Sequence, residues 1–184
     1  MIWRGIDLGR VTFTTLALNG EGGRMWYKDA QREIAEYSAR HGFDSGIVCD
    51  TLAIFSPRVT VGISIELADE WLHTGKAPRA MRARVKALQA YASSGVFNGP
   101  KINAFAQALR GDPDAVVVDA WMFRAAREQR TTPKAYREVC HKVRQAANGL
   151  GWPAAECQAA IWQGAREYVG YHTDGYAPMR LGHL

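Results

Sequence analysis

The sequence lacks the long apolar segments of a membrane or secreted protein. No apolar run in its 184 residues approaches the about 18 residues that a membrane-spanning helix needs. Arg4, Asp7 and Arg10 interrupt the start of the chain, which argues against a signal peptide. With 47% hydrophobic and 22% charged residues, the composition is that of an ordinary soluble globular protein. These features predict a cytoplasmic protein with no membrane partner.

Cysteine is also scarce. The three cysteines, Cys49, Cys140 and Cys157, are odd in number and widely spaced along the chain. This spacing argues against a disulfide framework, a zinc site and a four-cysteine iron–sulfur cluster. We therefore expect reduced thiols, no iron–sulfur cluster, no metal and no other cofactor.

Acidic residues are missing between Trp71 and Gly111. The net charge of the chain is only +5, so the distribution of charge matters more than its size. A basic surface without acids suits phosphate groups. A solvated helix face, whose counter-charges come from elsewhere in the fold, is an equally common explanation of such a run. The basic residues of this segment are Lys76, Arg79, Arg82, Arg84, Lys86, Lys101 and Arg110.

Apolar residues recur at helical spacing after about residue 25. We predict an all-α fold of about eight short helices in one compact domain over residues 25–170, and we expect a monomer. Two lobes joined near residues 74–78 and again near 130 are an alternative. The predicted helices cover residues 28–40, 46–55, 62–73, 79–92, 100–109, a short stretch after 119, 133–148 and 153–168.

The two ends of the chain lack this spacing. Within residues 1–24, the stretch VTFTTLALNGEGG alternates weakly and contains Asn-Gly and Gly-Gly, which are typical of hairpin turns. We predict a short β-hairpin or an extended arm there. Residues 171–184 are predicted to be irregular.

A helix, a glycine turn and a second helix are predicted around Gly99. Such a turn offers free N–H groups and the positive end of a helix dipole to a phosphate. Lys101 lies in the first turn of the second helix, where the dipole favours loss of its proton, and a neutral lysine is a nucleophile. A solvated or phosphate-contacting lysine is the commoner case. The candidate DNA contacts are Asn98, Gly99, Pro100, Arg58, Arg79, Arg82 and Lys86.

Asp119 is a carboxylate between Val118 and the apolar stretch that begins at Ala120. A charge in such surroundings costs free energy unless it is paired or caps a helix. One hypothesis is a helix N-cap, which asparagine or serine would serve equally well. The other is a catalytic acid, and the two are compatible because a cap keeps the carboxylate ionised.

The stretch FNGPKINAFAQAL, followed by DAVVVDAWMFRA, resembles the core of the helix-hairpin-helix DNA glycosylase superfamily. In that superfamily a hairpin ends in Gly-x-Lys, and an apolar run leads into Val-Asp and a helix that ends in an arginine. Lys101 and Asp119, 18 residues apart, match its catalytic lysine and aspartate in type, order and spacing. The upstream stretch TLAIFSPRVTVGISIELADEWL is similar to another helix, turn and helix of the superfamily.

A second resemblance covers roughly residues 25–170 and is to an uncharacterised group of small phage-encoded and actinobacterial proteins. The superfamily usually has a first hairpin glycine where this chain has Phe97, and a glutamine that enters the DNA stack is common where it has Arg58. The cysteine cluster of some relatives is missing. The elements shared with the phage group are Trp26-Tyr27, Ser56 to Thr60, Gly99-Pro100-Lys101 with Phe105, and Gly111 to Asp119.

The resemblance implies a DNA N-glycosylase that acts on a damaged or modified base flipped out of double-stranded DNA. Asp119 would stabilise positive charge on the sugar, and Lys101 could form a Schiff base and nick the strand by β-elimination. Candidate walls of the base pocket are Trp26, Tyr27 and Trp121, although aromatics at helical spacing more often belong to a core.

Two other functions remain open. Phage relatives of this fold are implicated in base hypermodification, which suggests a group-transfer enzyme that acts on a modified thymine. A DNA-binding protein without catalysis is the other alternative, and it is suggested by Phe97 and Arg58.

Overall fold

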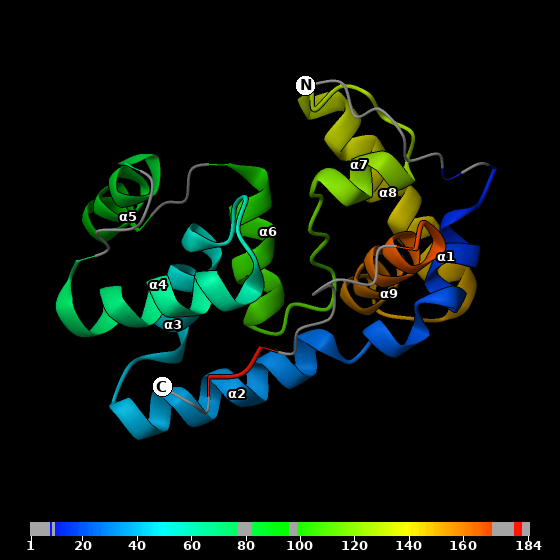
Figure 1. The fold of residues 1–184 in the computed structure, drawn as a ribbon. Coiled ribbons are helices and arrows are strands. Elements are labelled where there is room, and N and C mark those ends of the chain that lie inside the picture. The colour runs from blue at the N-terminus through cyan, green and yellow to red at the C-terminus, as the bar shows by residue number, and fades with distance from the viewer. Residues whose placement is uncertain (1–7, 9, 77–81, 96–98, 171–178, 182–184) are drawn as a thin grey trace. The chain divides into compact units, whose positions relative to one another are not determined.

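The computed structural model describes residues 8, 10–76, 82–95, 99–170 and 179–181. Over these residues the protein has nine α-helices, one short 3-10 helix and no strand (Figure 1), which confirms the predicted all-α class. None of the helices in the described ranges is both long and apolar enough to cross a membrane. The helices are α1 Phe13–Asn19, η1 Glu21–Gly23, α2 Trp26–His41, α3 Ser45–Phe55, α4 Val61–Thr74, α5 Arg82–Ser94, α6 Pro100–Leu109, α7 Ala120–Ala125, α8 Pro133–Leu150 and α9 Ala154–Tyr168.

The chain forms two compact units. Unit 1 contains Met1–Tyr27 and Pro113–Tyr176, and unit 2 contains Lys28–Asp112 and Ala177–Leu184. This division differs from the predicted single domain over 25–170 and from the alternative joints near 74–78 and 130. Helical periodicity shows which face of a helix is apolar, but it does not show which apolar faces meet.

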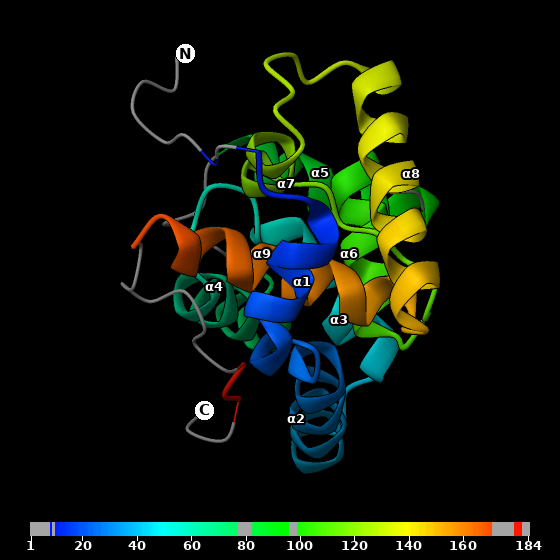
Figure 2. The ribbon, with the colours of Figure 1, turned by 90° about the vertical axis from the view of Figure 1, so that its right-hand side faces the viewer.

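Helix α9 lies at the centre of unit 1. It contacts α1, η1, α7 and α8, and Figure 2 shows α1 crossing it. Every residue from Ala154 to Ile161 is buried, so α9 is apolar almost all round. The exceptions in this stretch are Gln158 and Glu156, and the Glu156 carboxylate accepts two hydrogen bonds from the Arg24 guanidinium at 2.8 and 3.2 Å. The buried acid is therefore compensated by a cation.

The β-hairpin prediction for residues 1–24 is wrong in the part that the structure describes. Thr12 caps a helix by accepting a hydrogen bond from the Thr15 amide, and α1 buries Phe13 and Leu16. Gly20 does not form a hairpin turn, because it brings the end of α1 against the backbone of α9. A Cβ at Gly20 would collide with the backbone at Gly164.

Helix α3 lies at the centre of unit 2 and contacts α4, α5 and α6. Every residue from Val48 to Phe55 is buried. The fully buried Asp50 is held by an ion pair with Arg110 and by a hydrogen bond from the Tyr91 hydroxyl. The predicted end of this helix at Ser56-Pro57 is confirmed.

A polar cluster that the sequence did not predict joins α2 and α4 in unit 2. The Tyr37 hydroxyl donates to Asp69 Oδ1 at 2.7 Å, and His73 Nδ1 lies 3.2 Å from the same oxygen. The other ring nitrogen of His73 lies 3.3 Å from His41 Nδ1. His41 and His73 are 32 positions apart in the sequence, and nothing in the local pattern of α2 or α4 indicates that they are in contact.

The three cysteines are free and buried, which agrees with the reduced thiols predicted from their spacing. Burial raises the pKa of the Cys49 and Cys157 thiols to about 11. Both thiols therefore stay protonated near neutral pH, and neither is an activated nucleophile.

Candidate active site

Asp119 is the N-cap of α7, as predicted, and its carboxylate is held by three donors. Oδ1 accepts hydrogen bonds from the Trp121 and Met122 amides at 2.9 and 3.0 Å. Oδ2 accepts a hydrogen bond from the Trp162 indole N–H at 2.9 Å. Asparagine would serve the cap but would set its amide donors against the indole donor, so the third contact favours a carboxylate at this position.

The segment before Asp119 sets its position. Residues Ala115 to Val118 form neither a helix nor a strand, and they are buried, with 2% to 6% of each residue exposed. The Tyr136 hydroxyl of α8 donates to the Val116 carbonyl at 3.2 Å. The apolar run is thus a buried connection rather than a strand. It leads to Asp119 at the start of α7, where the aspartate is half-buried.

Two tryptophans and two arginines surround the carboxylate of Asp119. The Arg124 guanidinium lies 4.5 Å from the ring centre of Trp121. The guanidinium of Arg166 lies 4.4 Å from the Trp162 ring and 5.6 Å from the Trp121 ring. Cations over tryptophan faces are attracted by the ring quadrupole, and both of these tryptophans donate hydrogen bonds to the Asp119 carboxylate.

Tyr27 supports this cluster from the start of α2. Its ring is buried, its hydroxyl donates to Gln158 Oε1 at 2.8 Å, and Trp26 packs edge-on against it at 5.0 Å. Burial raises the pKa of the Tyr27 phenol far above its ordinary value, and the negative charge of Asp119 raises it further. Of the three predicted pocket residues, Tyr27 is therefore neutral and buried, whereas Trp26 and Trp121 are half-buried.

Lys101, the predicted partner of Asp119, is in unit 2. It is the second residue of α6, after Pro100 at the first helical position, and it is half-buried. Gly99 precedes the helix with a φ of 110°, a conformation that favours glycine. The helical placement predicted for Lys101 is confirmed. Asp119 belongs to unit 1, so each of the two predicted catalytic residues is described within its own unit.

The basic residues predicted to contact DNA occupy exposed positions in unit 2 where the structure describes them. Arg82 and Lys86 lie one turn apart on α5, and Arg58 lies in the turn before α4. Arg84 instead points inward, donates to the Pro57 carbonyl and has its pKa lowered first by burial and then by the charge of Arg58. The predicted contacts Asn98 and Arg79 lie outside the described residues.

Residues 15–168 match the sequence pattern of DUF7178, a family of unknown function. The chain belongs to DUF7178. Neither a curated protein nor a solved structure matches the chain. The DUF7178 match begins at residue 15 rather than at the predicted boundary of 25, which agrees with the position of α1 in the core of unit 1.

Three residues of this DUF7178 chain that were not predicted from the sequence complete the Asp119 site. Gln158, Trp162 and Arg166 lie on one face of α9 and contact the cluster around Asp119, Trp121 and Tyr27. The signal in the sequence is the spacing of four residues between them, which places polar and aromatic side chains on one face of α9. The rest of this helix is rich in small apolar residues. Only the contact with α7 shows what this face contacts.

Proposed function

We propose that this DUF7178 protein is a DNA-binding enzyme of the glycosylase type, which releases a damaged or modified base that is flipped out of the duplex. The observation that carries the proposal is the Asp119 carboxylate, which is half-buried, held by three donors and bordered by two tryptophans. The resemblance of the segments around Lys101 and Asp119 to the helix-hairpin-helix glycosylases supports the same activity.

The chemistry requires an ionised carboxylate in a defined place. When the bond between C1′ of the sugar and the base nitrogen breaks, the base leaves with the electron pair and positive charge develops on the sugar. A carboxylate beside C1′ stabilises that charge and accepts a proton from the attacking group. Three donors hold Asp119 in one rotamer, so no reorganisation is needed when the charge develops.

The tryptophans suit the flipped base. An extruded base is held by stacking and by contacts to its edge, and Trp121 and Trp162 are half-buried indoles beside Asp119, each with an arginine guanidinium over one face. Lys101 is the candidate amine nucleophile. Attack by its amine would form a Schiff base with the sugar and lead to strand cleavage, whereas attack by water would leave an intact abasic strand.

Binding to the DNA backbone is supported by the exposed cations of unit 2. Neither Arg82 nor Lys86 forms an ion pair with any described residue. Unpaired cations one turn apart along a helix can contact successive phosphates of a DNA strand. The DNA releases its bound counterions when these cations neutralise the phosphates. The glycine turn at Gly99 adds backbone N–H groups at the start of α6.

Asp119→Asn is expected to lower the rate of base release at least about 100-fold, because asparagine keeps the α7 cap but loses the negative charge. The measurement is single-turnover release of free base from duplexes that carry a panel of damaged and modified bases. Asp114→Asn is the matched control, since Asp114 is exposed on the segment that leads to the same helix. It should leave the rate unchanged.

Other outcomes of the same assay separate the remaining functions. Borohydride should trap an adduct with the wild type and none with Lys101→Arg if the lysine is the nucleophile. Altered nucleosides without abasic sites, seen by mass spectrometry, would replace the glycosylase with a group-transfer enzyme. The three donors on Asp119 also suit a purely structural cap, and no base release on any substrate would favour a DNA-binding protein without catalysis.

Reversal of charge at α5 is expected to weaken DNA binding. The double variant Arg82→Glu and Lys86→Glu should lose at least about tenfold in affinity at moderate salt and lower the salt slope by about two. Titration of a labelled duplex at several salt concentrations measures both quantities. Lys28→Glu with Arg32→Glu is the control, because these exposed residues have the same spacing on α2 in the same unit. Equal losses in the two double variants would contradict a specific DNA surface on α5.

A further inference from the structure

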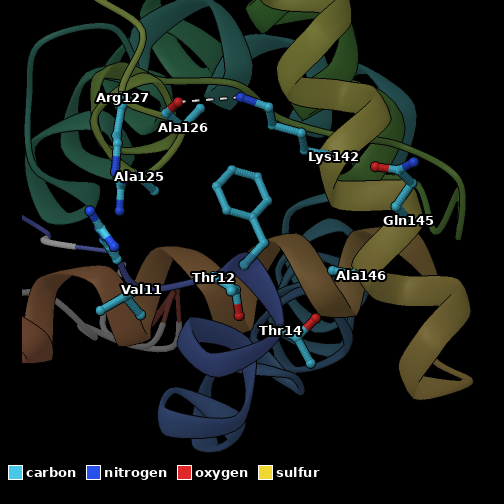
Figure 3. Close-up of a pocket in the computed structure, with 11 residues that line it drawn as sticks. Val11, Thr12, Thr14, Ala125, Ala126, Arg127, Lys142, Gln145 and Ala146 are labelled. Carbon is cyan, nitrogen blue, oxygen red and sulfur yellow. Dashed lines mark hydrogen bonds between the residues drawn. The ribbon is translucent and has the colours of Figure 1, made fainter.

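A hollow of about 460 Å³ opens within unit 1, at the end of α7 opposite to Asp119. It lies where the start of α1, the end of α7 and the middle of α8 meet. Figure 3 shows Arg127 and Lys142 on opposite sides of the hollow, with Thr12 and Thr14 below them. The volume is in the range of about 300–1,000 Å³ that is usual for small-molecule sites.

The charge around the hollow is of one sign. Three cations line it, Arg10, Arg127 and Lys142, and no acidic residue is among the described lining residues. None of the three cations forms an ion pair within the described part of the chain, and Lys142 Nζ makes one long hydrogen bond of 3.4 Å to the Ala126 carbonyl. Like charges gathered around a cavity repel one another, and an anion between them removes that cost.

The backbone at Arg127 supports a binding role. Its φ is 60°, in the left-handed region that glycine or asparagine adopts more easily. Two backbone hydrogen bonds close α7 there, from the Arg127 amide to Arg124 and from the Glu128 amide to Phe123, each at 2.9 Å. This is the position after a helix where glycine is commonest. The positive φ of Arg127 costs conformational free energy, and binding of an anion by its side chain can offset that cost.

The hollow also has apolar lining residues. Val11, Phe13 and the alanines at the end of α7 line it together with the polar groups of Thr12 and Gln145. A site for an inorganic anion alone would need only the cations. The combination suits a ligand that has both a phosphate and a flat apolar ring, with hydroxyl and amide groups available to polar edges.

We propose that this hollow binds a nucleotide unit, with its phosphate between Arg10, Arg127 and Lys142 and its ring against Phe13. The site does not depend on the proposed catalytic role of Asp119. A free nucleotide and a nucleotide at the end of a DNA strand share this chemistry, so both are probes.

The test is calorimetric titration of the full chain with dAMP, deoxyadenosine and inorganic phosphate. The proposal expects dAMP to bind at least about tenfold more tightly than either fragment, because each fragment lacks one half of the contacts. Lys142→Met and Arg127→Asn should each weaken dAMP binding about tenfold or more. Asparagine accepts the positive φ of position 127, so the second variant should remain folded.

Lys134→Met is the matched control, because Lys134 is an exposed lysine on the same helix α8 that does not line the hollow. It should leave dAMP binding unchanged. Equal weakening by Lys134→Met and Lys142→Met would overturn the proposal, as would phosphate that binds as tightly as dAMP or no dAMP binding at all. If a short 5′-phosphorylated oligonucleotide displaces dAMP, the ligand of the hollow is the end of a DNA strand. If it does not displace dAMP, the ligand is a free nucleotide. None of these readouts requires base release, so failure of the catalytic proposal would be seen separately.

Discussion

Gly164→Ala is expected to lower the free energy of unfolding by at least about 3 kcal/mol, because the added methyl group has no space. Gly164 of α9 faces α1, and a Cβ there would collide with the carbonyl of Leu16 and come close to the Gly20 amide. All of these atoms belong to the backbone, so no side chain can move aside. The two helices would have to separate along the centre of the unit 1 core.

Gly149→Ala is the control for this prediction. Gly149 lies near the end of α8, also in a helix, and a Cβ there would meet nothing within 4 Å. Alanine has the higher helix propensity, so this variant should be unchanged or more stable by up to about 1 kcal/mol. Urea denaturation followed by circular dichroism measures both variants. Equal stability of Gly164→Ala and the wild type would show that α1 does not pack on α9 as described.

Arg110→Met is expected to destabilise the protein by about 2–3 kcal/mol at pH 7, because it leaves the carboxylate of Asp50 without its cation. Asp50 is fully buried in α3, and the remaining partner would be the Tyr91 hydroxyl. The Arg110 side chain is 40% exposed, so solvent screens part of the interaction and the estimate is below that for a wholly buried pair.

This loss should depend on pH in a defined direction. Burial raises the pKa of Asp50 above its ordinary 3.8, while Tyr91 and Arg110 lower it in part. Without Arg110 the native pKa rises further, so the native state binds the proton more strongly than the unfolded chain does. A raised native pKa contributes stability at low pH that is lost as pH rises through it. The deficit of Arg110→Met should therefore shrink as pH falls from 7 through the raised native pKa toward 3.8.

Urea denaturation at several pH values between 7 and 4 measures this trend. Arg32→Met is the control, because its ion pair with Asp29 at 3.0 Å is exposed on α2. Its loss should stay below about 1 kcal/mol. A deficit of Arg110→Met that stays constant over the pH range would contradict a charged Asp50 as its cause.

Much of the secondary structure was predictable because its signals are local. Pro57 ends α3 and Thr132 with Pro133 opens α8 where the sequence predicts, since proline geometry and hydroxyl caps act over a few residues. Asp119 at the start of α7 belongs to the same class. The candidate site was predictable only in its own short motifs, the glycine turn before Lys101 and the capping aspartate.

Tertiary structure alone decided the meaning of residues whose partners are distant in sequence. Asn19-Gly20 has the local chemistry of a hairpin turn, yet Gly20 serves close packing against Gly164 of α9. Likewise the indole donor of Asp119 comes from Trp162, 43 residues away. The sequence by itself determined the all-α class, the capping role of Asp119 and the exposed cations on α5. The division into two units, and the side chains that surround the aspartate, depend on which apolar faces pack together, and helical periodicity is the same for every choice of partner.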